Sequence, residues 1–190
     1  DYPYLSSSAN HIMDITVGYS ADSSLSRSNS VQQSKKINIY NQMAQVLVGH
    51  DHTGAILRFD QDGDIVSGGT KLHECFFLNF SRLLTKDEIK KGSFSITVMT
   101  GGTYAARTND LTISDSGAAN DYRVNSPAGE YAVLYPEAGH AAGRKVGLIY
   151  YQAGIVVLTA SIFGAGDTAG ASLTNPFVPT TASNYFGDGT

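Results

Sequence analysis

Two apolar segments near residue 150 predict the centre of an antiparallel sheet. Val146, Leu148 and Tyr150 alternate along the first segment, and residues 152–154 offer a turn into the second. The second segment, residues 155–158, is apolar at every position. A strand that is apolar on both faces is typical of a sheet covered on both sides. We therefore expect this hairpin to lie between two packed layers.

Alternation with a period of two predicts that most of the remaining core is β-structure. Charged residues make up 16% of the chain, below the ~25% of an average soluble protein, which favours strands and turns over exposed helices. The predicted strands are residues 76–83, which we expect to be half-buried, 94–98, 111–113 and 131–135, with a further hairpin formed by 55–59 and 65–67. The predicted fold is mainly β: an antiparallel sandwich or small barrel with one or two short helices and extended terminal arms.

One segment, residues 34–49, has the spacing of a helix. Ile37, Tyr40, Ala44 and Leu47 recur at helical intervals, and Gly49 is suited to the end of a helix. Lysines 35 and 36 are unfavourable at the positive end of the helix dipole, so a strand remains an alternative. A second, shorter helical turn is predicted over residues 85–92.

Composition divides the chain into a core and two arms. Residues 1–30 form a polar, Ser-rich N-terminal arm, residues 31–164 a β-rich core domain, and residues 165–190 a Gly-, Thr- and Pro-rich C-terminal arm. Apolar-poor segments do not offset the entropy of their own ordering, so such a segment is either flexible or held by a partner, and we expect one or both arms to pack against a neighbouring subunit. The predicted anchors are the aromatic residues of the arms, Tyr2, Tyr4, Phe177, Tyr185 and Phe186.

Charge and cysteine content argue against several classes of function. A net charge of -4 argues against nucleic-acid binding, which needs clustered Lys and Arg. No apolar run is long enough for a membrane helix, and we expect no membrane partner. The single cysteine, Cys75, cannot supply a disulfide framework or a four-thiolate zinc site within the chain. Because it begins at Asp1, we expect the chain to be a mature product, a trimmed product or a piece of something longer.

Three acidic residues in one turn raise the question of a cation site. Asp60, Asp62 and Asp64 have the alternate spacing with which a loop directs carboxylates at calcium. An EF-hand loop would have Gly at its sixth position and Glu at its twelfth, where this chain has Ile65 and Lys71. We therefore interpret the segment as a solvated hairpin turn and keep an occasional cation site as the alternative.

Other combinations of reactive residues do not form a recognisable centre. His50, His52, His73, Glu74 and Cys75 resemble transition-metal ligands, but no second ligand pair follows at a diagnostic spacing. We interpret them as surface or strand-end residues, and Cys75 as a small buried residue. The sequence Ser-Asp-Ser-Gly at 114–117 lacks the flanking strand and helix of a nucleophile elbow. The chain is predicted to be no enzyme and to need no cofactor.

Three segments resemble a known class of proteins: SVQQSKKINIYNQMAQVLVG (30–49), FFLNFSRLLTKDEIKKGSFSITV (76–98) and VGLIYYQAGIVVLT (146–159). They are similar to segments of virion structural proteins from large contractile-tailed phages, especially those that infect marine cyanobacteria. The resemblance implies a non-enzymatic, multi-copy building block of a tail, baseplate, neck or fibre attachment. It also implies a location in the virion, with other virion proteins and copies of the same chain as partners.

Two alternatives remain open on the sequence alone. The chain is alternatively a receptor- or glycan-binding module whose recognition loops lie at residues 101–125 and 136–143, around the short strand at 111–113. A hydrolase is the third possibility, because catalytic pairs can be distant in sequence. Asp14, Glu74, Glu130 and Glu137 are available for a carboxylate pair, although nothing in the sequence brings any two of them together.

Overall fold

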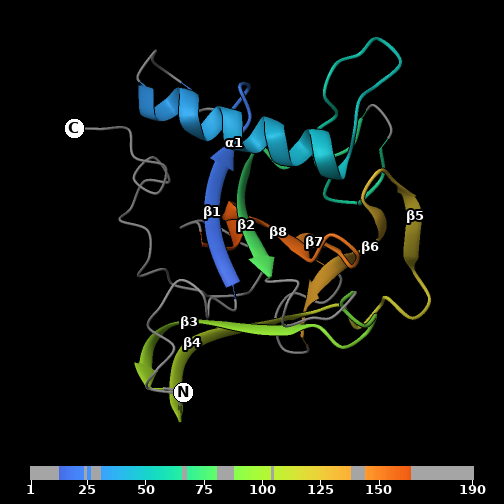
Figure 1. The fold of residues 1–190 in the computed structure, drawn as a ribbon. Helices are drawn as coiled ribbons and strands as arrows, with labels where there is room; N and C mark the ends of the chain where they lie inside the picture. Colours follow the sequence, from blue (N-terminus) through green and yellow to red (C-terminus); the bar gives the residue numbers. More distant parts are fainter. Residues whose placement is uncertain are drawn as a thin grey trace.

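Eight antiparallel strands form one curled, half-barrel sheet (Figure 1). The computed structural model describes residues 13–23, 25–26, 31–65, 68–80, 88–103, 105–137 and 144–163. The strands are β1 (Met13–Tyr19), β2 (Glu74–Phe80), β3 (Ser95–Thr103), β4 (Ala106–Ser114), β5 (Tyr122–Ser126), β6 (Gly129–Pro136), β7 (Gly147–Tyr150) and β8 (Ile155–Thr159). A single α-helix, α1 (Val31–Leu47), and a 3-10 turn, η2 (Ala160–Phe163), complete the described elements. The predicted mainly β, antiparallel fold with few helices is confirmed.

The hairpin predicted at residues 146–158 lies at the centre of the sheet. The strand order is β1-β2-β8-β7-β6-β4-β3, with β5 paired to β6 at one side. β7 and β8 join at a turn that contains Gly154, whose φ of 66° suits glycine. Gly147 is also required, because a Cβ there would lie 2.2 Å from the Val157 carbonyl oxygen. The prediction of a central, doubly covered hairpin is confirmed.

Two apolar clusters cover opposite faces of the sheet. The first, here called the helix-side core, consists of Tyr40, Ala44, Leu47, Val48, Phe59, Leu72, Cys75, Phe77, Tyr131, Val133, Leu148, Tyr150 and Val157. The second, the hairpin-side core, consists of Leu78, Phe94, Leu111, Ile113, Ala118, Ala132, Leu134, Val146, Ile149, Tyr151, Val156, Leu158 and Ile162. Alternate residues of β2 enter the two clusters, with Phe77 on the helix side and Leu78 on the hairpin side. The strand predicted at 76–83 is present up to Phe80, but Phe77 is buried on the face that was expected to be exposed, and residues 81–83 lie outside the described residues.

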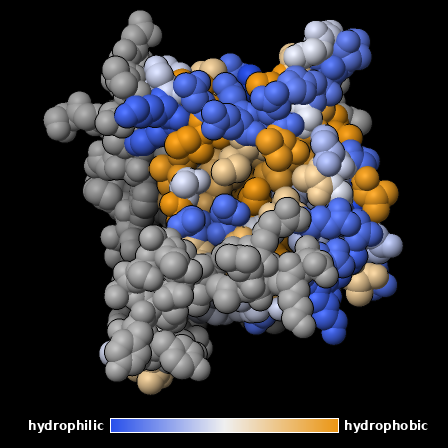
Figure 2. Space-filling model, viewed as in Figure 1, coloured by the Kyte–Doolittle hydropathy of each residue, from blue (hydrophilic) through white to orange (hydrophobic). Residues whose placement is uncertain are grey.

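The predicted helix is present and packs closely on the sheet. Tyr40, Ala44 and Leu47 are buried along one side of α1, and Gly49 follows the helix with a φ of 94°. A Cβ at Gly18 would lie 2.9 Å from the Lys36 carbonyl oxygen, so the glycine lets β1 approach α1. Figure 2 shows polar residues along the outer side of α1 and apolar residues beneath it. The described residues contain no helix with the length and apolar character needed to cross a membrane.

Strand β1 differs from the sequence expectation. Residues 13–19 fall within the predicted N-terminal arm, yet β1 pairs with β2 over seven residue pairs, from Met13 opposite Phe80 to Tyr19 opposite Glu74. Met13, Ile15 and Val17 alternate with the polar Asp14 and Thr16, but this pattern is short and lies in a Ser-rich segment, and the pairing with β2 makes the strand favourable. Residues 1–12 of the N-terminal arm and the whole C-terminal arm at 165–190 lie outside the described residues.

Three other expectations need correction. Residues 55–59 and 65 form no strand, and the predicted hairpin is replaced by isolated bridges that join His50 to Ile56 and Asp60 to Lys71. Gly101 and Gly102 lie inside β3 rather than in a loop, and the short strand predicted at 111–113 is the end of β4. Pairing with a neighbouring strand overrides the weak strand preference of glycine. Of the helical turn predicted at 85–92, residues 85–87 lie outside the described residues, and residues 88–92 form no helix, with only a turn at Lys91 and Gly92.

Candidate interaction surface

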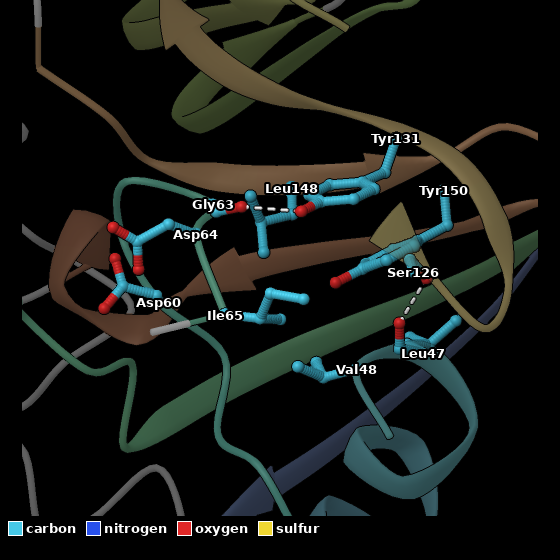
Figure 3. A pocket seen from close by; sticks show the side chains of 10 residues that line it. All are labelled: Leu47, Val48, Asp60, Gly63, Asp64, Ile65, Ser126, Tyr131, Leu148 and Tyr150. Carbon is cyan, nitrogen blue, oxygen red and sulfur yellow. Dashed lines mark hydrogen bonds between the residues drawn. The ribbon is translucent and has the colours of Figure 1, made fainter. Parts of the chain in front are cut away.

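A small pocket lies between the end of α1, the loop that follows Asp60, and strands β5, β6 and β7 (Figure 3). It is lined by Leu47, Val48, Asp60, Gly63, Asp64, Ile65, Ser126, Tyr131, Leu148 and Tyr150. Its cavity volume is about 10 Å³, which is the lower limit for a single water molecule. The pocket is therefore too small for an organic substrate in this conformation.

The polar groups of the pocket connect parts of the fold. The Tyr131 hydroxyl lies 2.8 Å from the Gly63 carbonyl oxygen and 2.6 Å from Asn125 Oδ1, so its single hydrogen is shared between these two acceptors. The Ser126 hydroxyl donates to the Leu47 carbonyl oxygen, which satisfies one acceptor at the end of α1. Burial raises the pKa of Tyr150 well above its ordinary value, so this phenol stays protonated and neutral near pH 7. These groups position loops and offer no activated nucleophile.

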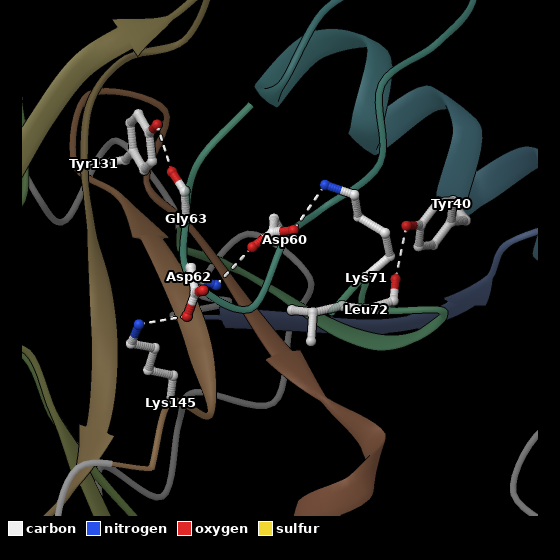
Figure 4. A network of polar contacts seen from close by, with 8 residues as sticks. All are labelled: Tyr40, Asp60, Asp62, Gly63, Lys71, Leu72, Tyr131 and Lys145. Carbon is white, nitrogen blue, oxygen red and sulfur yellow. Dashed lines mark hydrogen bonds and ion pairs between the residues drawn. The ribbon is translucent and has the colours of Figure 1, made fainter. Parts of the chain in front are cut away.

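The acidic loop forms a turn for the reason the sequence predicts. Gly63 has a φ of 70°, and its N–H donates to the Asp60 carbonyl oxygen at 3.0 Å. The Asp60 side chain reinforces the turn, since its Oδ1 accepts the Asp62 N–H at 2.8 Å (Figure 4). The Asp-Gln-Asp-Gly sequence therefore specifies a turn. It does not predict where the side chains of that turn point.

Asp60 is buried and paired rather than solvated. Its side chain is 0% exposed, and its Oδ2 accepts from Lys71 Nζ at 2.7 Å. A Cβ at Gly69 would lie 2.7 Å from the same carboxylate oxygen, so a side chain there would crowd the pair. The prediction of a solvated turn is wrong at Asp60, because Lys71 neutralises the acid eleven residues later in the chain.

The three carboxylates of the loop do not converge on a cation. Asp62 faces Lys145 instead, and the hydrogen bond from that ammonium lowers the pKa of Asp62. Asp64 lines the pocket, and its Oδ1 is buried with no hydrogen-bond partner in the described part of the chain. Within the described ranges, no group of three or more His, Cys, Asp or Glu side chains is placed to hold a metal ion. The alternative of a cation site at these residues receives no support.

The histidine and cysteine candidates are dispersed among separate contacts. His50 and His52 are exposed, whereas His73 Nδ1 lies 2.8 Å from the Ser20 hydroxyl oxygen. Glu74 accepts from the Ser23 hydroxyl, which holds the segment after β1 against the start of β2. Cys75 is fully buried, and burial raises the pKa of its thiol, so the thiol is unreactive as a nucleophile. The interpretation of Cys75 as a small buried residue is confirmed.

Asp115 is a buried hydrogen-bond acceptor that connects three segments of the fold, and the sequence analysis missed it. The side chain follows β4 and is almost fully buried. It accepts from the Gly92 N–H at 2.7 Å, the Phe94 N–H at 3.0 Å and the Tyr151 hydroxyl at 2.9 Å. Burial and the hydrogen bond to this carboxylate raise the pKa of Tyr151. An aspartate followed by Ser and Gly indicates a turn, but its partners lie up to 36 residues away.

Large apolar side chains are exposed at the periphery. Ile15 on β1 is 58% exposed, Val46 on α1 59%, and Tyr122 and Val124 on β5 47% and 67%. Lys91 Nζ lies over the Tyr122 ring, 5.1 Å from the ring centroid, in a favourable cation-π contact. Such residues on peripheral strands are candidates for contacts with another polypeptide. The period-two alternation of β1 was the signal in the sequence that would have found Ile15.

The predicted anchors of the arms are not among these residues. Tyr2, Tyr4, Phe177, Tyr185 and Phe186 all lie outside the described residues. Their role in packing against a neighbouring subunit stays a prediction. Comparison with protein-family profiles, with curated protein sequences and with solved structures found no match to this chain.

Proposed function

We propose that this chain is a non-enzymatic structural subunit of a phage virion, part of a tail, baseplate, neck or fibre attachment. It acts by assembly with other virion proteins and with copies of itself. The observation that carries the proposal is the distribution of chemistry in the described residues. Buried acids such as Asp60 and Asp115 are held by structural partners, while apolar side chains project from peripheral strands. That distribution suits a protein that binds surfaces better than one that transforms a small molecule.

The phage assignment depends on the three segments that resemble virion proteins. Residues 30–49 correspond to α1 with its flanking residues, residues 76–98 include most of β2 and the start of β3, and residues 146–159 form the β7–β8 hairpin. These segments contribute residues to both cores of the domain, such as Tyr40, Phe77 and Val157 on the helix side and Leu78 and Val156 on the hairpin side. The resemblance therefore lies in helices and strands of the core, and it supports a fold shared between this chain and the virion proteins that it resembles.

A recognition module has weaker support. Residues 101–125, expected to be recognition loops, belong largely to β3, β4 and the start of β5. Tyr122 is the exposed aromatic side chain of that range among the described residues, and Lys91 lies over its ring. A glycan-binding face generally presents several stacked or adjacent rings. A single partly covered tyrosine among the described residues does not favour that alternative over assembly, while Tyr104 and residues 138–143 of the second predicted loop lie outside the described residues.

The assembly role is tested by the composition of phage particles. Particles of the phage that encodes this chain are purified by density gradient, washed in high salt, and analysed by quantitative mass spectrometry. We expect the chain at a constant ratio to the other structural proteins before and after the wash. Loss of the chain in the wash, or a ratio that varies between preparations as for host contaminants, would contradict the proposal.

A further inference from the structure

The backbone of β1 leaves a row of hydrogen-bonding groups on the outer edge of the sheet. The Ser20 N–H donates to the His73 carbonyl oxygen at 2.7 Å, and the Phe80 N–H donates away from β1, to the Gly154 carbonyl oxygen at 2.9 Å. Because antiparallel strands bond through alternate residues, the even-numbered residues of β1 face β2. The backbone groups of Met13, Ile15 and Val17 therefore point outward. The described strands end at β1 on this side.

Among the described residues, β1 lacks three common features that protect sheet edges from pairing, and its one charged side chain is Asp14. Proteins commonly protect an edge with Lys, Pro or a β-bulge. β1 has the sequence Met-Asp-Ile-Thr-Val-Gly-Tyr, without Lys, Arg or Pro, and its register with β2 is continuous. By contrast, β5 has a register shift between Arg123 and Ser126. The exposed side chain of Ile15 lies at the middle of the unprotected edge.

The sequence of this edge complements itself. Around Ile15, the pattern Met-Asp-Ile-Thr-Val is apolar, polar, apolar, polar, apolar in both directions. An antiparallel copy centred on Ile15 would place Met13 opposite Val17, and Ile15 opposite Ile15. Asp14 would lie opposite the Thr16 hydroxyl, which can donate to it. An axis at Asp14 would instead oppose two like charges, and an axis at Thr16 would carry the partner strand over the buried Gly18 and Tyr19.

We infer that β1 binds β1 of a second copy of this chain, antiparallel, about a twofold axis at Ile15. The inference deepens the proposed assembly role by naming one surface and one partner. Three outward-facing residues in each strand provide about six main-chain hydrogen bonds, and they extend the sheet across the axis. The contact area of two short strands is small, so dimerisation is weak in solution and is reinforced where many copies are held together.

The dimer is tested on the full chain by sedimentation at increasing protein concentration. We expect reversible dimerisation, and Ile15→Lys raises the dissociation constant at least about tenfold, because a lysine at the axis faces its own copy. Val46→Lys is the matched control, since Val46 is as exposed as Ile15 but lies on α1. Circular dichroism establishes that both variants fold. A chain that stays monomeric at every concentration, or an equal effect of the two variants, would overturn the inference.

The register is tested by crosslinking single cysteines with a short bis-maleimide. Cys75 is fully buried, so an introduced thiol is the accessible one. We expect Ile15→Cys to give a covalent dimer and Val46→Cys to give none. A mixture of Met13→Cys and Val17→Cys chains should crosslink better than either alone, and equal crosslinking in all three samples would refute this register. If the chain is present in particles but does not pair through β1, the inference fails while the proposed function stands.

Discussion

Asp60 and Asp115 are both buried acids, but the fold stabilises them in different ways. Asp60 lies in the loop beside the helix-side core, where Lys71 supplies a positive charge and the Asp62 N–H one hydrogen bond. Asp115 follows β4 beside the hairpin-side core, where it accepts from two backbone N–H groups and a tyrosine hydroxyl. Asp115 has no ion pair among the residues that the structure describes. The positive charge of Lys71 stabilises Asp60, whereas neutral N–H and O–H donors stabilise Asp115.

The two solutions differ in how easily water can replace a lost partner. The Lys71 side chain is 21% exposed, so water can reach the Asp60 carboxylate when the lysine is shortened. The donors to Asp115 are fixed by the backbone before β3 and by Tyr151, and two of them, the Phe94 N–H and the Tyr151 hydroxyl, belong to buried residues. Unsatisfied donors in such a place incur the full penalty of desolvation. Asp115 should therefore be the more sensitive of the two positions.

The largest effect is expected from Asp115→Ala. The change leaves two buried donors, the Phe94 N–H and the Tyr151 hydroxyl, and the more exposed Gly92 N–H without this acceptor, and it frees the segment at residues 92–94 from the end of β4. We expect the free energy of unfolding to fall by about 3–5 kcal/mol, measured by urea denaturation. Asp121→Ala is the control, since Asp121 is exposed and its ion pair with Arg123 is long, at 3.9 Å. A loss at Asp115 no greater than at Asp121 would contradict this account.

A smaller effect is expected from Lys71→Met. The variant keeps the apolar stem but leaves the Asp60 carboxylate uncompensated, which we expect to lower the free energy of unfolding by about 2 kcal/mol. The double variant Asp60→Asn with Lys71→Met should recover part of this loss, because the amide oxygen still accepts the Asp62 N–H while the buried charge is removed. If the double variant is less stable than Lys71→Met alone, the charge of Asp60 is not the cause.

The parts of the fold that follow from local pattern are those whose contacts are close in sequence. The β7–β8 hairpin was predicted because the strands and the turn at Gly154 lie within fifteen residues, and α1 because Tyr40, Ala44 and Leu47 share one side. β1 was missed because its polar residues form a strand only against β2, about sixty residues later. The alternation of Met13, Ile15 and Val17 is a short local signal, and nothing in a single sequence identifies a partner strand at that separation.

The same limit applies to the acids and to the surface. The sequence predicted the turn at Asp60, since Asp and Gly at these positions act locally, but the burial of the carboxylate depends on Lys71. Asp115 was taken as part of a loop, because Tyr151 and Phe94 reach it only in the folded chain. Ile15 was taken as part of the polar N-terminal arm, and its exposure depends on the place of β1 at the edge.

Gly69→Ala tests how tightly the Asp60 pair is enclosed. Gly69 has a φ of 66°, and its Cβ would lie 2.7 Å from Asp60 Oδ2. Gly54→Ala is the matched control, because Gly54 has a φ of 86° and nothing within 4 Å of its Cβ. Both variants incur the strain of a positive φ, and we expect Gly69→Ala to be less stable than Gly54→Ala by about 1 kcal/mol. Equal stabilities in urea denaturation would mean that the carboxylate moves aside freely.

The smallest effect is expected at Asp62, the exposed acid of the same loop, and its pH dependence reveals which kind of partner it has. Lys145 lowers the pKa of Asp62 from 3.8, and Asp62 raises the pKa of Lys145 from 10.5. An acid whose pKa is lowered in the folded chain stabilises the fold above its ordinary pKa, and this contribution is lost as the pH falls through the folded pKa. An ammonium whose pKa is raised in the folded chain stabilises the fold below its ordinary pKa, and this contribution is lost as the pH rises through the folded pKa. The stability difference between the natural chain and Asp62→Asn should therefore be constant between these limits and shrink on both sides.

Asp51 is the control, because the Thr53 hydroxyl and backbone N–H groups lower its pKa, so the difference for Asp51→Asn should shrink in acid and persist in alkali. Urea midpoints measured from acid to alkaline pH decide the matter, and identical profiles for the two variants would show that the Lys145 charge contributes nothing at Asp62.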